Sequence, residues 1–254
     1  MGRRLAIAAV IAAAAVAAGG AISLAISEVG TPLGDTIAGT DKPDALWGED
    51  GNDQLTGKGG NDYLEAGPGS DRIDAGPGAD LAIGGTGNDT ILLGAGNDVA
   101  YAGPGNDQVL GEGGNDVLLG QLENDRLFGG PGADRIYTGT GNDYADGGAG
   151  ADQIFADAGT STLAGGSGND RIVGVGGTFT VDGGDGRDRI SVRGGNDTVT
   201  GGTGRDKIST GAGNDHVDVA DGERDVVDCG SGDDTVRADK KDVLQHCEHV
   251  TLVK

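Results

Sequence analysis

Polar and apolar positions alternate in short, regularly spaced groups along most of this chain. Groups such as Arg72-Ile73-Asp74 and His216-Val217-Asp218 place one apolar residue between two polar ones, and such a group recurs about every nine residues. Alternation with a period of two residues predicts a short strand that directs one side chain inward. The segments between the groups are rich in Gly and Asn, which tolerate positive φ and form tight turns. Each nine-residue unit therefore predicts one turn followed by one strand.

Aspartate occupies the sixth position of nearly every unit. The unit at residues 84–92 reads GGTGNDTIL, and only Ser161 and Phe179 interrupt a series of aspartates at every ninth residue from Asp35 to Asp215. Because one strand cannot bury its single apolar residue alone, the units must stack. We predict an all-β protein, a right-handed parallel β-roll with two nonapeptides per coil and two parallel sheets back to back.

Stacking brings each aspartate next to the aspartate eighteen residues away, on a neighbouring rung about 4.8 Å distant. A ladder of close carboxylates repels itself unless cations lie between the rungs, and carboxylate and carbonyl oxygens suit Ca²⁺ rather than zinc or copper. The predicted metal ligands are Asp35, Asp44, Asp53, Asp62, Asp71, Asp80, Asp89, Asp98, Asp107, Asp116, Asp125, Asp134, Asp143, Asp152, Asp170, Asp188, Asp197, Asp206 and Asp215.

The ladder divides between two edges of the roll. Asp35, Asp53 and every second aspartate after them form the first edge, and Asp44, Asp62 and the alternate series form the second edge. Ser161 and Phe179 are neighbouring rungs of the first edge, so the gaps beside them lack a pair of carboxylates. Counting the gaps that keep both carboxylates predicts about 16 calcium sites.

The repeated motif, G-G-x-G-x-D-x-U-x with U apolar, resembles the RTX or hemolysin-type calcium-binding repeat family. The resemblance extends over about 185 residues, from 34 to 218. It implies a parallel β-roll in which calcium lies between successive turns, held by the position-six aspartates and by carbonyls of the glycine-rich turns. Catalytic and pore-forming domains accompany such repeats in many relatives; none is expected here, so protease and toxin activity are not carried over.

Composition supports a fold that depends on its ligand. The formal charge is −23, from 18 Lys and Arg against 41 Asp and Glu, and 54 residues are glycine. With a thin core and so much backbone entropy to lose, the chain is expected to be disordered without calcium and to fold when calcium binds. The acidic surface excludes nucleic acid as an expected partner.

The two ends differ from the repeats. Residues 1–25 carry Arg3 and Arg4 before a small and apolar run, which predicts a secretory signal peptide or, alternatively, an N-terminal membrane anchor. Residues 26–33 are a lead-in, residues 34–218 the array, and residues 219–254 a capping segment in which one residue is inserted near Asp225. In an exported chain Cys229 and Cys247 are expected to form a disulfide; a zinc site with His246 and His249 is the alternative.

No enzyme motif is present in the sequence. It lacks H-E-x-x-H, and it lacks G-x-S-x-G with a histidine placed for a triad. We expect a secreted or surface-anchored calcium-binding β-roll without catalytic activity, with a structural or interaction role. The alternative is a cell-surface adhesive or self-associating protein, and an accessory module of a secreted hydrolase or toxin system ranks third.

The adhesive alternative depends on an apolar row at the outward ninth positions of one sheet. The row includes Tyr101, Leu119, Tyr137 and Phe155, and an apolar face of this length is unusual for a monomer in solvent. Partner binding or self-association would cover it, or residues 26–33 or an uncleaved N-terminal helix would fold back over it. Between the sheets, the small Ala82 and Ala100 predict the thinnest part of the core, opposite Ile91.

Overall fold

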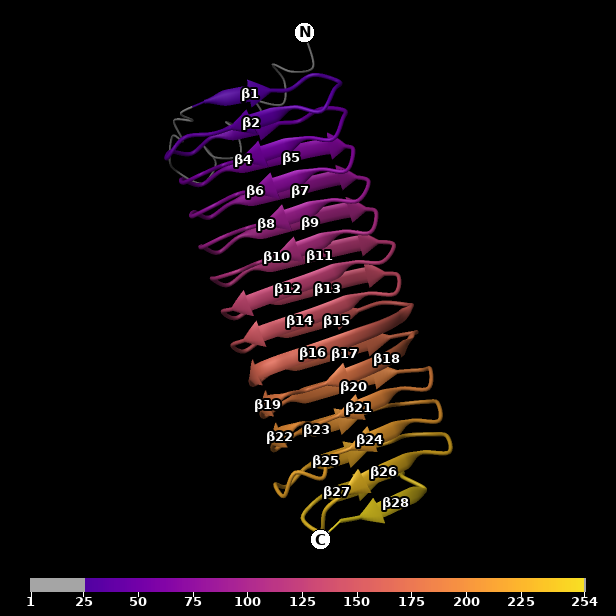
Figure 1. Ribbon diagram of the computed structural model, residues 1–254. Helices are drawn as coiled ribbons and strands as arrows, with labels where there is room; N and C mark the ends of the chain where they lie inside the picture. The colour runs from indigo at the N-terminus through magenta and orange to yellow at the C-terminus, as the bar shows by residue number, and fades with distance from the viewer. Residues whose placement is uncertain (1–25, 254) are drawn as a thin grey trace, which may run out of the picture.

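The computed structural model describes residues 26–253, which form one elongated stack of strands (Figure 1). Strands alternate between two parallel sheets along the chain. The 13-stranded sheet contains β1 (Ser27–Val29), β3 (Ala45–Trp47), β5 (Tyr63–Pro68), β7 (Leu81–Thr86), β9 (Val99–Pro104), β11 (Val117–Leu122), β13 (Arg135–Thr140), β15 (Gln153–Ala156), β17 (Arg171–Val175), β20 (Arg189–Arg193), β23 (Lys207–Ser209), β25 (Val226–Asp228) and β27 (Val243–Gln245).

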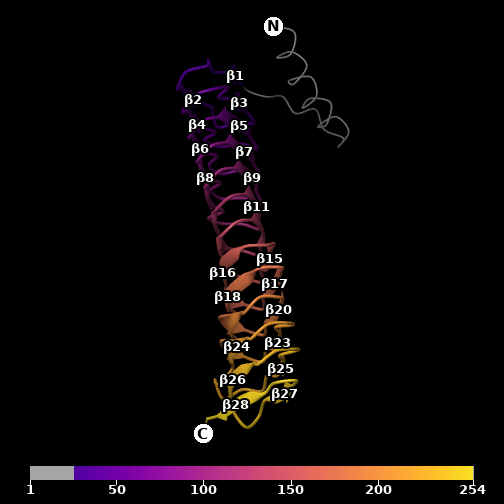
Figure 2. The ribbon, with the colours of Figure 1, turned by 90° about the vertical axis from the view of Figure 1, so that its right-hand side faces the viewer.

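The second sheet follows the same path. The 15-stranded sheet contains β2 (Thr36–Ala38), β4 (Gln54–Thr56), β6 (Arg72–Asp74), β8 (Thr90–Leu92), β10 (Gln108–Leu110), β12 (Arg126–Pro131), β14 (Tyr144–Ala149), β16 (Thr160–Gly168), β18 (Thr178–Asp182), β21 (Thr198–Thr200), β24 (His216–Asp218), β26 (Thr235–Ala238) and β28 (His249–Leu252), with β19 (Asp185–Gly186) and β22 (Thr203–Gly204) beside it. Seen from the side, the stack is narrow (Figure 2).

The register between rungs is eighteen residues through the repeats. Ile91 pairs with Ile73 on one side and with Val109 on the other, and Leu118 lies between Ala100 and Ile136. The all-β parallel roll with two nonapeptides per coil is therefore confirmed. No helix occurs within residues 26–253, and that part of the chain accordingly contains no helix long and apolar enough to span a membrane.

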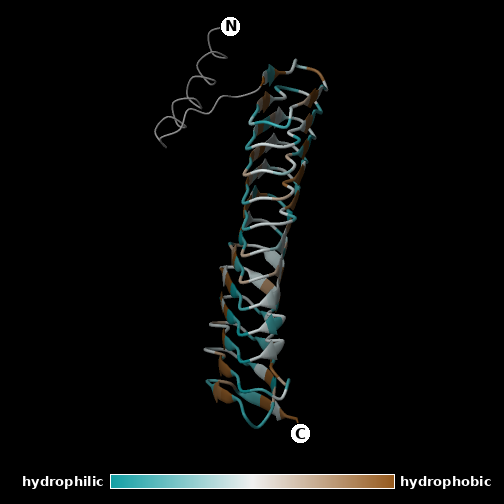
Figure 3. Cartoon of the chain, turned by 90° about the vertical axis from the view of Figure 1, so that its left-hand side faces the viewer, coloured by the Kyte–Doolittle hydropathy of each residue, from teal (hydrophilic) through white to brown (hydrophobic). Residues whose placement is uncertain are grey.

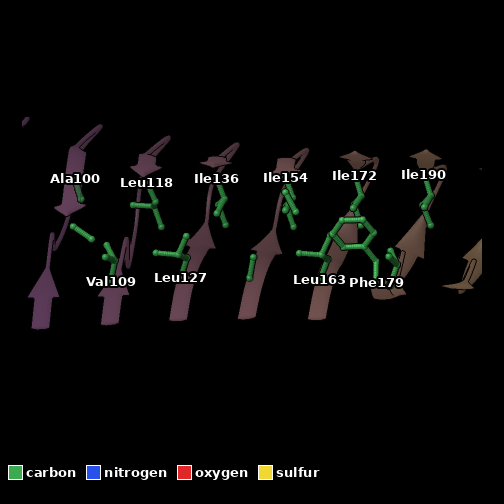
Figure 4. Packing of buried hydrophobic residues seen from close by; sticks show 14 of the residues in the cluster. Ala100, Val109, Leu118, Leu127, Ile136, Ile154, Leu163, Ile172, Phe179 and Ile190 are labelled. Carbon is green, nitrogen blue, oxygen red and sulfur yellow. The ribbon is translucent and has the colours of Figure 1, made fainter. Parts of the chain in front are cut away.

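The core lies between the sheets and is one side chain deep from each. The eighth position of each repeat is buried, as in Ile73, Ile91 and Leu118, all 0% exposed. Ala82 and Ala100 are buried neighbours in register in the 13-stranded sheet. Figure 4 shows how little of the space between the sheets Ala100 fills compared with the neighbouring Leu118 and Ile136.

A second buried column was not predicted. The first position of a repeat is also buried where it carries a side chain, as in Ala66, Leu93 and Val192. The reason is the two-residue period of a strand, which directs positions six, eight and one of the next repeat to the same inner side. The expectation of one core residue per nine therefore understated the core.

Glycine is required where turns on successive rungs touch. At Gly87, φ is 123°, and a Cβ there would collide with the carbonyl oxygen of Gly69. Several turns depart from this rule with a single non-glycine residue at positive φ, at Glu49, Lys58 and Glu112, and one turn holds two, Gln121 and Glu123, with φ values of 84° and 77°. Non-glycine residues are strained in that region of backbone space.

The N-terminal lead-in does not cover a face of the roll. Strand β1 pairs in parallel with β3 and forms the first rung of the 13-stranded sheet. The suggestion that residues 26–33 fold back over the outer face is therefore wrong: extended backbone here satisfies the hydrogen bonds of the sheet's first edge. The signal peptide or anchor predicted for residues 1–25 lies outside the described residues.

At the C-terminal end the strands continue after the insertion. Lys207 pairs with Val226, nineteen residues away, and β27 and β28 complete the two sheets. The predicted disulfide is confirmed between Cys229 and Cys247. Colouring by hydropathy shows apolar positions recurring between polar ones down the long axis (Figure 3).

Candidate metal centre

The position-six aspartates point inward along both edges of the roll. Asp89, Asp116 and Asp134 are at most 2% exposed, although they are charged residues in turns. Their burial follows from the alternation that buries positions six, eight and one together. The chain thus places a column of carboxylates at each margin of its apolar core.

Successive aspartates are linked by hydrogen bonds. The backbone N–H of Asp80 donates to Oδ1 of Asp98 (2.7 Å), and the N–H of Asp98 donates to Oδ1 of Asp116 (2.8 Å). The first edge repeats the arrangement, with Asp71 donating to Asp89 at 2.8 Å. Each carboxylate therefore uses one oxygen to fix the register of the rung before it.

The second oxygen of these carboxylates has no partner. Oδ2 is buried without a hydrogen bond in Asp53, Asp62, Asp71, Asp80, Asp89, Asp98, Asp107, Asp116, Asp125, Asp134, Asp143, Asp152, Asp170, Asp188, Asp197, Asp206, Asp215 and Asp234. Burying an anionic oxygen without compensation is costly, and native proteins avoid it. So regular a series of orphaned oxygens indicates that a cation completes each site.

Burial also shifts the titration of the ladder. It raises the pKa of Asp89 to about 7; the N–H of Asp71 opposes the shift, while the charges of Asp107 and Asp71 increase it. Burial likewise raises the pKa of Asp80 and Asp116 to about 7. Without a cation, the ladder therefore resists full ionisation near neutral pH.

The space beside each orphaned oxygen also contains a backbone carbonyl. A Cβ at Gly84, the first position of its repeat, would lie 2.6 Å from Oδ2 of Asp89 and 2.5 Å from the carbonyl oxygen of Ala102. Gly111 has the same surroundings, with Oδ2 of Asp116 at 2.6 Å. Carboxylate and carbonyl oxygens without nitrogen or sulfur are the donors that Ca²⁺ prefers, so the residues present fit this ion.

Backbone carbonyls must supply much of the coordination. Within residues 26–253 no three His, Cys, Asp or Glu side chains gather as a metal cluster. The zinc alternative at the C-terminus fails for a separate reason, because Cys247 is held in the disulfide. His246 and His249 instead contact Asp228 and Asp233, at 2.8 Å and 2.6 Å.

Two rungs of the first edge are built without an aspartate. The hydroxyl of Ser161 accepts the N–H of Asp143 at 3.1 Å. Phe179 is 0% exposed, and its ring fills the space beside Gly174 and Gly177, where a Cβ would lie 2.7 Å and 2.9 Å from it. The ring lies among the aliphatic side chains of the core in Figure 4. An apolar residue at position six thus occupies the space that a carboxylate occupies elsewhere.

The first rung of each edge also differs. Oδ2 of Asp35 accepts hydrogen bonds from the backbone and hydroxyl of Thr31, and Oδ2 of Asp44 accepts the same pair from Thr40. Oδ2 of these two aspartates therefore already has partners, unlike Oδ2 of the aspartates after them, and Oδ1 of Asp44 also accepts the N–H of Ile26.

The ladders continue beyond the aspartates predicted from the sequence. Asp206 donates its N–H to Asp225 and Asp215 to Asp234, each at nineteen residues' separation. Asp242 and Glu248 then accept the N–H groups of Asp225 and Asp234. The sequence contains a signal for these two ladder positions, because Asp225 and Asp234 are nine residues apart after the single-residue insertion.

Comparison with known proteins agrees with this geometry. The profile for the RTX calcium-binding nonapeptide repeat, which spans four copies, matches overlapping stretches from residue 29 to residue 226. A search of curated proteins finds no match. The matched stretches cover well over half of the chain and the same units that form the rungs. The protein therefore belongs to the RTX calcium-binding nonapeptide repeat family.

Proposed function

We propose that this is an exported, non-enzymatic protein whose roll folds when calcium enters the two aspartate ladders, and whose role is structural or interaction-based. The observation that carries the proposal is the series of buried Oδ2 atoms without partners. RTX repeats are typical of secreted proteins, and a disulfide is typical of an oxidising compartment.

Calcium would act here as part of the fold. The aspartates hold it by the unpaired oxygen while the other oxygen keeps the neighbouring rung in register. Because the unfolded chain has no assembled site, the free energy of binding becomes free energy of folding. Extracellular calcium modules work at weak affinity, so weak sites would suffice for a role outside the cytoplasm.

The test is a calcium titration of the full chain followed by far-UV circular dichroism and by hydrodynamic radius. Calcium should convert an expanded, disordered chain into a compact β-rich one, and chelator should reverse the change. Magnesium at the same concentration is the matched control, because it demands a smaller octahedral site. A fold that is unchanged by chelator would refute the proposal.

The number of ions follows from the carboxylate pairs. Among the regularly spaced aspartates, the ladder adds the gaps 206/225 and 215/234, while Oδ2 of Asp35 and Asp44 already accepts hydrogen bonds, so the expected number stays about 16. The gap beside Phe179 should hold none. Phe179→Ala should lower stability but leave the number of bound ions unchanged, as measured by equilibrium dialysis.

A second candidate role is adhesion or self-association through the outer face of the 13-stranded sheet. Tyr101 and Tyr137 are 39% and 40% exposed on that face. Tyr101→Asp with Leu119→Asp should abolish association while leaving calcium-induced folding intact. A wild-type chain that remains a monomer and binds nothing through this face would exclude the role.

A further inference from the structure

The outer face of the 13-stranded sheet combines an apolar stretch with a basic one. From β7 to β23 its outward positions contain no acidic residue, although the chain has 41 Asp and Glu. Strands β7 to β11 present Tyr101, Leu119 and their apolar neighbours. Toward the C-terminus the exposed Arg171, Arg189 and Lys207 occupy three successive rungs in register.

The two stretches are continuous. Tyr137 and Phe155 stack with their ring centroids 5.0 Å apart, and the guanidinium of Arg171 lies 5.2 Å from the centre of the Phe155 ring. The other sheet lacks this organisation, because its outward residues on comparable rungs include Asp146, Asp182 and Asp218. The combination is therefore a property of one face and not of the roll as a whole.

We propose that this face docks on the surface of a membrane rich in anionic lipid. The proposal deepens the adhesive role above and rests on the calcium-folded roll. Anionic headgroups would pair with Arg171, Arg189 and Lys207, and no outward carboxylate lies between β7 and β23 to neutralise them. Tyrosine and phenylalanine suit the boundary between headgroups and acyl chains, and the aliphatic side chains would reach the acyl region.

Other partners fit only part of the face. A soluble polyanion would contact the basic rungs but leave the apolar strands exposed. A second copy of the stretch from β7 to β23 would bring no acidic residue to the cations, so pairing of two such stretches lacks charge complementarity. On the other sheet the outward Asp146, Asp182 and Asp218 oppose an approach to anionic lipid, which would leave this face as the one that can dock.

The experiment is co-sedimentation of the calcium-saturated full chain with vesicles. Vesicles of phosphatidylcholine and phosphatidylglycerol in equal parts should bind the protein, and vesicles of phosphatidylcholine alone should not. Arg189→Gln with Lys207→Gln should weaken binding roughly 30-fold, from the usual contribution of two basic residues near an anionic surface. Arg72→Gln with Arg126→Gln removes the same charge from the other sheet and should leave the affinity unchanged.

Leu119→Ser with Tyr101→Ser tests the contribution of the apolar side chains and should also weaken vesicle binding. The inference is overturned if the folded wild type does not bind anionic vesicles. It is also overturned if the charge variants of the two sheets weaken binding equally. It is also overturned if calcium merely bridges acidic side chains to lipid, because Arg189 and Lys207 would then not matter. Binding of dextran sulfate with no effect of the serine variants would indicate a soluble polyanion, and dimerisation through Tyr101 and Leu119 would indicate a second copy.

Folding is followed separately. Circular dichroism in calcium should show the same β-rich state for every variant. If calcium does not fold the wild type, the proposed function fails; if the protein folds but does not bind vesicles, only the membrane inference fails.

Discussion

Replacing one ladder aspartate by asparagine should have opposite effects with and without calcium. Asp116 lies in the middle of the second edge, where its Oδ1 accepts the N–H of Asp98 (2.8 Å) and its own N–H donates to Asp134 (2.7 Å). Its Oδ2 is buried and unpaired. Asp116→Asn keeps the shape and the acceptor, and it removes the negative charge.

The direction of the stability change in the metal-free protein follows from the pKa of Asp116. Burial raises the pKa of Asp116 to about 7, and the charges of Asp134 and Asp98 add to the shift. Because the folded-state pKa exceeds the unfolded one, the ionised carboxylate destabilises the metal-free fold above about pH 7, and this penalty fades as pH falls toward about 4. The shift corresponds to about 4 kcal/mol at most; after solvent screening we expect Asp116→Asn to stabilise the metal-free roll by about 2 kcal/mol at pH 8.

With calcium bound, Asp116→Asn should destabilise the roll and not stabilise it. Asp116 flanks two gaps of the ladder, toward Asp98 and toward Asp134. If each flanking site loses about tenfold in affinity, the calcium-saturated variant is destabilised by about 3 kcal/mol.

Two measurements check this reversal. In chelator, trimethylamine N-oxide can bring the metal-free chain into its folding transition, and circular dichroism at pH 8 and pH 5.5 compares the midpoints. In calcium, guanidinium unfolding compares the stability of the variant with that of the wild type. Asp182→Asn, on the exposed outer face of β18, is the control and should be near neutral in both. The same sign of effect in chelator and in calcium would refute the assignment of Asp116 as a buried calcium ligand.

Three further changes probe other parts of the fold. Ile91→Ala should destabilise the calcium-saturated roll by about 2–5 kcal/mol in guanidinium unfolding, because the alanines opposite cannot fill the cavity; a near-neutral effect would show that the inward register is wrong. Glu123→Gly should raise stability by about 1 kcal/mol, because φ at this residue is 77°, whereas Glu65→Gly within β5 should lower it. Cys229→Ser with Cys247→Ser opens a loop of eighteen residues and should cost about 3 kcal/mol; dithiothreitol should lower the melting temperature of the wild type and not of this variant.

Most of the architecture could be predicted because the repeat is strict. A nine-residue period with one apolar residue per short strand permits few stackings other than a coil of eighteen. The register of Ile73, Ile91 and Val109 follows directly from that count. The disulfide pairing followed from having only two cysteines.

The features that the sequence did not predict lie mostly where the nine-residue period is interrupted. A single inserted residue hid Asp225 and Asp234 from a nine-residue count, although the hydrogen-bond ladder passes through both. Residues 26–33 lack the motif, so their sequence did not show that β1 continues the sheet. The buried first position was missed because it reads as part of a glycine-rich turn, although Leu93 and Val192 extend the strand's inner side.

Position six decides how each rung is attached to the next. With aspartate, the rung gains a register-setting hydrogen bond and a buried, unpaired oxygen that requires a cation. With phenylalanine, as at Phe179, the same inward space is filled by an apolar ring and no charge is buried. A roll of such rungs would fold without calcium, because burial of apolar area needs no ion. Under the proposed function, the nearly unbroken use of aspartate makes the fold conditional on calcium, and the rungs of Ser161 and Phe179 are the ones on the first edge that need no ion.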